Sequence, residues 1–290
     1  MPSVLADFTG YATVEPKDWE RPTQVRILLN ETQLVLAVNE EDKLVISLNQ
    51  IFDITINSLP QVVDPMPGTP VTVAFTHEES RTTVVVSADE QTSEKFYTVL
   101  FKAILNGTYT TLKHPAKVGG RVLDTPFEAG ILSLETSGVQ FDTNEGPVRI
   151  PLDAVVDFSR EKRAVDGEQR PVLVVSHIST GESLTSVAAI ENPRKLSLLG
   201  RYLRQQYQPV IDSLRTLELT EQETEALTTI YSVGDMDVSL PSVLDTDPQT
   251  AKRILHSLHE KGLVESGAGA PVLTAKGQIV VNEYLERVNA

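Results

Sequence analysis

The chain has 290 residues, 40% of them hydrophobic, and a formal net charge of −15. It contains no cysteine, which excludes disulfides, thiolate metal sites and thiol nucleophiles. No apolar run approaches the roughly 18 residues that a membrane span needs. The first residues lack the charged and apolar segments of a signal peptide, so we expect a cytoplasmic protein.

The first part of the chain predicts antiparallel strands followed by one helix. After an apolar start and a proline-containing loop at 15–22, apolar residues alternate with polar ones or gather in short runs, as half-buried strands require. The expected strands lie at 25–29, 34–38, 44–48, 51–56, 71–76 and 82–87. Residues 57–70 hold four prolines and predict a long loop. From Ser93 to Leu105 the apolar residues fall at helical spacing, and Asn106-Gly107 ends that helix.

The next part repeats this order after a predicted linker at 107–120. Strands are expected at 129–134, 139–141, 148–152, 154–158, 172–177 and 183–188. A charged loop at 159–170 takes the place of the proline-rich loop. We expect a helix from Pro193 to about Gln208, where Pro209 ends it.

A sequence repeat joins these two parts. Shifted by 104 positions, residues 23–54 align without a gap on residues 127–158, with nine identical positions. The clearest match ends in Asp53 and Asp157, and farther along an offset of 100 pairs His77 with His177. A period of this length suits a whole small domain rather than a solenoid.

We therefore predict a duplicated α+β domain of about six or seven antiparallel strands, capped by a C-terminal helix. A small, strongly bent sheet has an open end that an amphipathic helix can close, and this is the architecture of the pleckstrin-homology-like (PH-like) fold. The predicted domains are 1–117 and 118–215, both PH-like, followed by 216–290.

The last predicted domain is a winged helix-turn-helix. Thr220 and Glu223 form a capping box at the start of its first helix, and a second short helix is expected at about 240–244. A third helix begins at Asp247-Pro248. Two short strands, separated by a turn that contains Gly267-Ala-Gly269, and a final helix complete the pattern.

Charge argues against DNA binding by this region. Residues 220–290 carry 5 basic and 11 acidic side chains, a net charge of −6, whereas groove binding needs several cations to neutralise phosphates. Only Lys252 and Arg253 are well placed on the third helix. We expect a docking or structural role, and a DNA-binding transcription regulator remains the alternative.

The sequence shows no arrangement typical of catalysis. Nucleophile-elbow, Walker and zincin patterns do not occur, and adjacent carboxylates lie in predicted turns. His256 and His259 lie three apart on one helix, but two ligands are too few for a metal site. We predict a protein that is not an enzyme and needs neither metal nor cofactor.

A group of basic side chains in the second copy interrupts the overall acidity. Arginine suits bidentate contacts with carboxylates, so we interpret the group as a docking face for an acidic protein partner. The alternative is a solvated face with ion pairs to Glu161 and Glu168. The predicted site residues are Arg160, Lys162, Arg163, Arg170, Arg194, Arg201 and Arg204. Phosphoinositide binding is not expected, because the first hairpin loops at 30–33 and 135–138 are acidic or neutral.

The order of the predicted domains, together with stretches such as 150–157, 258–264 and 273–277, resembles the CheF family of archaeal taxis adaptors over nearly the full length. The resemblance implies an adaptor that links the response regulator CheY, with CheC and CheD, to the cytosolic accessory proteins of the archaellum motor. It would thereby control rotational switching, in the cytoplasm or recruited to the motor at the membrane. Nucleic acid and membrane insertion are not expected, and a homodimer is left open. A structural interaction protein unrelated to taxis is a further alternative.

Overall fold

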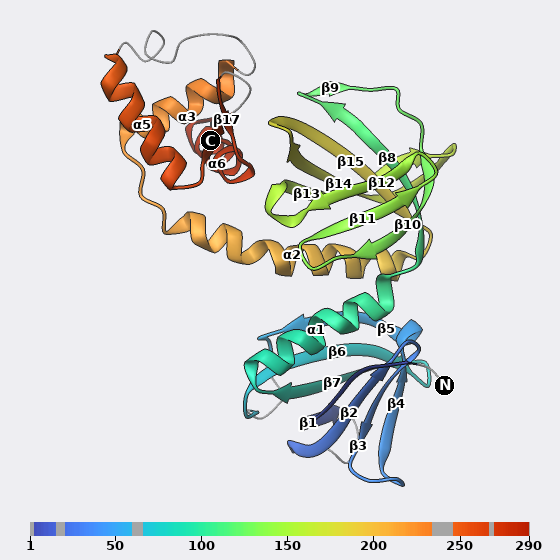
Figure 1. Ribbon diagram of the computed structural model, residues 1–290. Coiled ribbons are helices and arrows are strands. Elements are labelled where there is room, and N and C mark those ends of the chain that lie inside the picture. Colours follow the sequence, from blue (N-terminus) through green and yellow to red (C-terminus); the bar gives the residue numbers. More distant parts are fainter. Residues whose placement is uncertain (1–2, 16–20, 60–65, 234–245, 267–269, 290) are drawn as a thin grey trace. The chain divides into compact units, whose positions relative to one another are not determined.

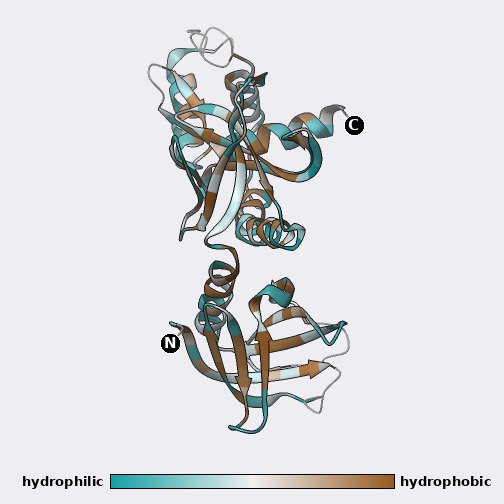
Figure 2. Cartoon of the chain, turned by 90° about the vertical axis from the view of Figure 1, so that its right-hand side faces the viewer, coloured by the Kyte–Doolittle hydropathy of each residue, from teal (hydrophilic) through white to brown (hydrophobic). Residues whose placement is uncertain are grey.

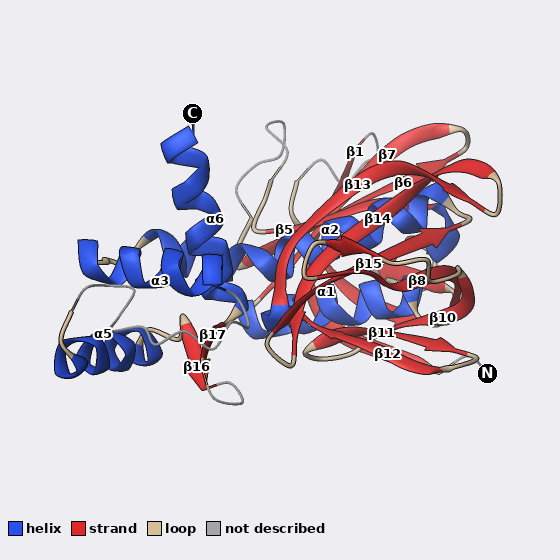
Figure 3. Ribbon diagram, turned by 90° about the horizontal axis from the view of Figure 1, so that it is seen from above, coloured by secondary structure: helices blue, strands red, loops and turns tan. Residues whose placement is uncertain are grey.

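The computed structural model describes residues 3–15, 21–59, 66–233, 246–266 and 270–289. The fold is α+β, with two large antiparallel sheets and a mainly helical C-terminal region (Figure 1, Figure 3). The residues gather into two compact units. Unit 1 comprises Met1–Tyr109, Ile131–Leu134 and Ile190–Leu203, and unit 2 comprises Thr110–Gly130, Glu135–Ala189 and Arg204–Ala290. The three predicted domain boundaries stay a prediction.

The first sheet has seven strands in the order β4-β3-β2-β1-β7-β6-β5. Its strands are β1 (Val4–Glu15), β2 (Thr23–Asn30), β3 (Gln33–Ala37), β4 (Lys43–Ser47), β5 (Ile51–Ile56), β6 (Thr69–His77) and β7 (Ser80–Ala88). A 3-10 turn, η1 (Leu48–Gln50), joins β4 to β5. In β2, Val25, Ile27 and Leu29 are buried while their neighbours are more exposed, so one face of the strand makes core.

Helix α1 (Glu90–Leu105) packs on this sheet as the periodicity predicts. Its N-cap is Asp89, whose carboxylate accepts a hydrogen bond from the Thr92 amide at 3.0 Å. Phe96, Leu100 and Phe101 are among its buried residues. Figure 2 shows hydrophobic residues concentrated along the strands and the helix of this part of the chain.

The second sheet repeats the same strand order, β12-β11-β10-β8-β15-β14-β13, with the short β9 (Arg121–Val122) paired to β8. Its other strands are β8 (Thr108–Val118), β10 (Glu128–Leu134), β11 (Gly138–Thr143), β12 (Gly146–Pro151), β13 (Val155–Val165), β14 (Glu168–Ser179) and β15 (Glu182–Ile190). The turn η2 (Leu152–Ala154) lies 104 residues after η1. The duplication predicted from the repeat is therefore confirmed in the topology.

The predicted linker at 107–120 is wrong, because most of it is β8 in the middle of the second sheet. The strand contains Pro115 and two lysines, and it lacks the clean alternation that marks a half-buried strand. Its counterpart β1 was likewise not recognised as a strand. Each sheet thus begins one strand earlier than expected.

The predicted charged loop at 159–170 is also wrong. These residues form the ends of β13 and β14 and the tight turn between them. Asp166 and Gly167 both have positive φ, at 51° and 83°, as a two-residue hairpin turn requires. The charged side chains thus lie on an ordered hairpin with a fixed register.

The predicted end of the second long helix at Pro209 is wrong as well. Helix α2 (Pro193–Arg215) continues through Pro209, which removes one backbone donor and normally costs about 3 kcal/mol inside a helix. Side chains beyond the proline, among them Val210 and Ile211, pack against a buried cluster that contains Val156. This apolar contact offsets the unfavourable backbone position.

The C-terminal region consists of α3 (Glu221–Val233), α5 (Pro248–Glu260), α6 (Ala275–Asn289) and a two-stranded ladder of β16 (Val264–Ser266) and β17 (Pro271–Leu273). Its core includes Leu227, Leu258 and Leu263. The predicted helix at 240–244 and the turn at 267–269 lie outside the described residues. Within the described ranges, no helix combines the length and the apolar character that a membrane span requires.

The predicted capping box at the start of α3 is confirmed. The Thr220 amide donates to Glu223 Oε2 at 2.8 Å, and the Glu223 amide donates to Thr220 Oγ1 at 3.2 Å. Burial opposes ionisation of Glu223, but Lys261 and Ser257 donate to its carboxylate and the net effect lowers the pKa of Glu223 to about 2. Glu223 of the capping box therefore also forms an ion pair with Lys261, which joins α3 to the end of α5.

Candidate partner-binding site

The β13–β14 hairpin separates its charges between two faces. Residues directly opposite in the ladder share a face, and the register pairs Arg163 with Arg170 and Lys162 with Pro171. Strand alternation places Glu161 on the face of Arg163, and Arg160 on the face of Lys162. Of the seven predicted site residues, these four are brought together by the structure within one unit.

On the first face the charges are matched within the hairpin. Arg163 Nε lies 2.9 Å from Glu161 Oε2, and an Arg170 Nη atom lies 2.7 Å from Glu168 Oε2. The hydrogen bond from Arg163 lowers the pKa of Glu161. The ion pairs that the solvated-face alternative predicts are therefore present for these two arginines. They offset the repulsion between the facing guanidinium groups and contribute little net stability at the surface.

On the second face the charge is positive. Arg160 and Lys162 lie between Phe158 and Ala164 on this face of β13, and their ladder neighbours on β14, Leu173 and Pro171, are neutral. Both cationic residues are exposed. We define the cationic hairpin face as Arg160, Lys162, Ala164, Gln169 and Pro171.

Arg201 lies on α2 in unit 1 and is engaged there. It donates from Nε and Nη2 to the two carboxylate oxygens of Asp53 on β5, both at 2.9 Å. The neighbouring Tyr202 ring packs against Phe101 of α1, with ring centroids 5.4 Å apart. A bidentate arginine–carboxylate pair of this kind fixes the relative orientation of the two side chains as well as pairing their charges. Arg201 therefore holds the first half of α2 to the first sheet rather than presenting a free cation.

The remaining two predicted arginines are exposed. Arg194 is in the first turn of α2, where its amide donates to the Asn192 side chain at 3.0 Å, and Arg204 lies three residues after Arg201. Arg194 belongs to unit 1, and Arg204 belongs to unit 2. The seven predicted residues are therefore divided between the two units, and their grouping into one site stays a prediction.

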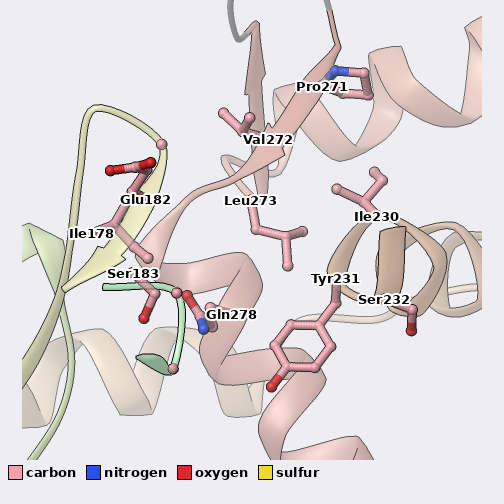
Figure 4. Close-up of a pocket in the computed structure, with 13 residues that line it drawn as sticks. Ile178, Glu182, Ser183, Ile230, Tyr231, Ser232, Pro271, Val272, Leu273 and Gln278 are labelled. Atoms are coloured by element: carbon pink, nitrogen blue, oxygen red, sulfur yellow. The ribbon is translucent and has the colours of Figure 1, made fainter. Parts of the chain in front are cut away.

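A pocket in unit 2 was not found from the sequence. It has a volume of about 580 Å³ and lies between strand ends of the second sheet and the C-terminal region. Figure 4 shows Ile230, Tyr231 and Leu273 around it, with Glu182 and Gln278 among them. Its lining comes from stretches far apart in the sequence, and no local motif marks it. Among the described residues that line the pocket, Glu182 is the only carboxylate.

A pair of histidines occupies the interior of the second sheet. His177 Nε2 lies 3.0 Å from Ser186 Oγ, and His114 Nδ1 lies 2.7 Å from the same atom, with the two rings stacked. Burial, and then the charge of His114, lower the pKa of His177 to about 4. Burial also lowers the pKa of His114. The cluster is neutral near pH 7 and belongs to the core.

The two histidines considered for metal binding, His256 and His259, are not part of the His114–His177 cluster. His259 Nδ1 is 3.2 Å from the Val264 carbonyl oxygen, and His256 Nε2 is 3.5 Å from Glu260 Oε1. In the described part of the chain, no group of three or more His, Asp or Glu side chains is placed to hold a metal ion.

Comparison with known proteins identifies the family. The family described as archaeal chemotaxis signal transduction system protein F (CheF) matches residues 4–209. The chain belongs to the CheF family. Taxis protein CheF2 of Halobacterium salinarum is 35% identical over 287 residues, covering 99% of each chain. Taxis protein CheF1 of the same organism is 27% identical over 268 residues, covering 90% of this chain and 89% of that protein.

Family membership places the protein in archaeal chemotaxis signalling and confirms the resemblance found from the sequence. The family match ends at residue 209, whereas the similarity to CheF2 extends across the C-terminal region. CheF is described by its signalling role and not by a catalysed reaction.

Proposed function

We propose that this CheF protein is a non-enzymatic adaptor between the taxis proteins and the archaellum motor. It would bind CheY, preferentially phosphorylated, together with CheC- and CheD-type proteins, and on another surface the cytosolic accessory proteins of the motor. Binding would occur in the cytoplasm or at the motor beneath the membrane. Family membership is the observation that carries the signalling role. Any switching must come from different affinities for the two states of a partner.

The proposed scaffold is two PH-like domains followed by a winged helix. The identical strand order of the two sheets, each accompanied by a long helix, supports the first assignment. The succession of α3, α5, the β16–β17 ladder and α6 supports the second. Rigid sheets with exposed hairpins suit a protein that holds partners in fixed positions.

The cationic hairpin face is the proposed contact for an acidic partner. Glu161 and Glu168 are paired with Arg163 and Arg170 on the opposite face, whereas Arg160 and Lys162 are exposed on this one. Exposed cations of this kind steer association and select partners of opposite charge. Arg201 is left out of this proposed contact because it is ion-paired with Asp53.

The test is a pull-down at high salt with phosphorylated CheY and the motor accessory proteins as separate baits. Lack of enrichment of both would refute the adaptor function. Lys162→Gln is then compared with Arg163→Gln, which removes one charge from the opposite face of the same hairpin. We expect Lys162→Gln to weaken binding of one partner by roughly three- to tenfold at low salt, and Arg163→Gln to have a smaller effect. Equal effects would remove the hairpin face from the proposal while leaving the adaptor role intact.

DNA binding is the second candidate. Helix α5 exposes Lys252 and Arg253, but an Arg253 Nη atom donates to Thr250 at 2.9 Å and Lys261 is paired with Glu223. Fluorescence anisotropy with random and genomic DNA across a salt series separates the two functions. Tight binding with a steep salt slope would favour the regulator.

A further inference from the structure

Strand β4 is an edge of the first sheet, and among the described residues no strand pairs with its outer side. The Leu48 amide donates to Thr32 O at 2.9 Å, and the Val38 amide donates to Asp42 O at 3.0 Å. Hydrogen-bonded pairs alternate along an antiparallel ladder, so between these two points Leu44 and Ile46 bond to β3. Lys43, Val45 and Ser47 therefore direct their N–H and C=O groups away from the sheet. The Ser47 amide is engaged by the Gln50 side chain at 3.3 Å.

An apolar row runs across the outer face of the sheet and ends at this edge. The ladder places Leu28 opposite Val35, and Val35 opposite Val45. Leu28 and Val35 are half-buried, whereas Val45 is 41% exposed. The inward neighbours Leu44 and Ile46 are core residues, so Val45 cannot turn inward without reversing the strand. Val45 is thus the most exposed member of the row.

The equivalent edge of the second sheet is blocked. The Leu152 amide donates to Ser137 O at 2.9 Å, which sets the same alternation and turns positions 147, 149 and 151 outward. Two of these three are prolines, which have no N–H to offer. The third is Arg149, ion-paired with Glu135 at 2.8 Å. Proline and charge are the usual means of protecting an edge strand. Of the three outward residues of β4 none is proline and only Lys43 is charged, so Val45 and Ser47 lack the protection of Arg149 and Pro151.

We propose that the β4 edge binds the β4 edge of a second copy of this chain, antiparallel and with the two-fold axis at Val45. This pairing is self-complementary. Val45 faces Val45 of the partner, Lys43 faces Ser47 of the partner, and no like charges lie opposite one another. In each chain the Val45 and Lys43 amides donate to carbonyl groups of the other chain, which gives four intermolecular hydrogen bonds. The hydrogen bond between the Ser47 amide and the Gln50 side chain is kept. The apolar row continues without interruption into the second copy.

The side chains along β4 suit pairing with a second copy. A two-fold turn about Val45 sets Val45 beside Val45 and Lys43 beside the uncharged Ser47. The acidic turn at 40–42 then lies beside residues 48–50 of the partner, Leu-Asn-Gln, which carry no charge. The two chains, each of net charge −15, repel one another at longer range. Salt screens this repulsion, so dimerisation strengthens as ionic strength rises.

Sedimentation equilibrium across a concentration and salt series tests the pairing. We expect the full chain to move from 31.8 kDa toward twice that mass, with a lower Kd at higher salt. Val45→Arg places two cations opposite each other, and Lys43→Pro copies the blocked edge of the second sheet. Each should raise Kd at least about tenfold with an unchanged melting temperature. Val122→Arg, at an equally apolar position that is 69% exposed on β9, should leave Kd unchanged.

Crosslinking fixes the register, because the chain has no native cysteine. Paired Cα atoms at a hydrogen-bonded site lie about 5.5 Å apart, within disulfide range. Val45→Cys should therefore form a disulfide dimer much faster than Val122→Cys. A monomer at all concentrations, or equal crosslinking of the two variants, would overturn the proposal. Loss of taxis-partner binding by Val45→Arg without any change in self-association would assign the edge to that partner instead.

Discussion

The first and second sheets share a strand order and differ in where they place polar and charged groups. In the first, Phe75 pairs with Ile51 as His177 pairs with Val155 in the second, so Phe75 is the counterpart of His177 in the ladder. Phe75 and the edge residue Val45 are both apolar. In the second, the interior holds the His114–Ser186–His177 cluster, the β12 edge carries Arg149, and β13 extends into a charged hairpin. Duplication thus preserved the alternation that builds a core, while the edges and one interior site diverged. The divergent residues Val45, Arg149 and Lys162 are exposed, whereas His177 and Ser186 of the histidine cluster are buried.

The largest expected effect comes from opening the blocked edge. The triple change Pro147→Lys, Arg149→Val and Pro151→Ser gives β12 the outward residues of β4. A chain with two open edges can associate at both, so we expect masses beyond twice 31.8 kDa by sedimentation velocity. Adding Val45→Arg to the triple variant should return the assembly to a dimer. Masses that never exceed those of the unaltered chain would mean that proline and charge do not explain the contrast.

The buried histidine of the second sheet predicts that the free energy of unfolding depends on pH. His177 has a pKa of about 4 in the folded chain against an ordinary value of 6.5. As the pH falls from 6.5 to 4 the unfolded chain takes up this proton and the folded chain does not, so the free energy of unfolding falls by up to about 3 kcal/mol. Above pH 6.5 the stabilisation is complete, and below pH 4 it no longer changes.

Urea denaturation at several pH values measures this slope. His177→Gln should flatten the slope between pH 6.5 and 4, whatever its effect on absolute stability. His77→Gln is the matched control, because His77 is only partly buried. A slope that His177→Gln leaves unchanged would assign the acid sensitivity to other groups.

A smaller effect is expected at the aspartates that end the repeat. Asp53 accepts hydrogen bonds from Nε and Nη2 of Arg201, and each side chain is 38% exposed. Asp157 is exposed on β13. Asp53→Ala should reduce the free energy of unfolding by about 1 kcal/mol, and Asp157→Ala by less than about 0.5 kcal/mol. A double-mutant cycle with Arg201→Ala gives the coupling directly, and Arg204→Glu should be nearly neutral. Equal losses for the two aspartates would show that the ion pair adds no stability.

Much of the fold follows from short-range patterns in the sequence. The stripe on α1, the Thr220–Glu223 capping box and the Asp247-Pro248 helix start are local features, and each is present as expected. The strands β1 and β8 are not recognisable in this way, because their pairing partners lie far away in sequence and their own alternation is weak. The β13–β14 hairpin did carry a local signal, Asp166-Gly167, which the surrounding charges obscured.

The candidate site was less predictable, because contacts between distant residues decide it. Arg201 looked equivalent to Arg204 on the helix, yet Asp53, 148 positions away, engages one and not the other. Register likewise determines that Glu161 lies with Arg163 and not with Lys162. Composition identifies the basic cluster, but only pairing in the sheet shows which of its charges are matched.

Helix α2 affects the order in which parts of the chain can fold during synthesis. Unit 1 includes residues 190–203, so the first sheet obtains its Arg201 and Tyr202 contacts only after the second sheet has been made. A chain cut near residue 118 would lack these contacts, and a nascent chain on the ribosome lacks them for most of translation. The N-terminal half therefore does not complete its folding ahead of the rest, as an independent N-terminal domain would. Thermal unfolding should accordingly couple the two units through one helix.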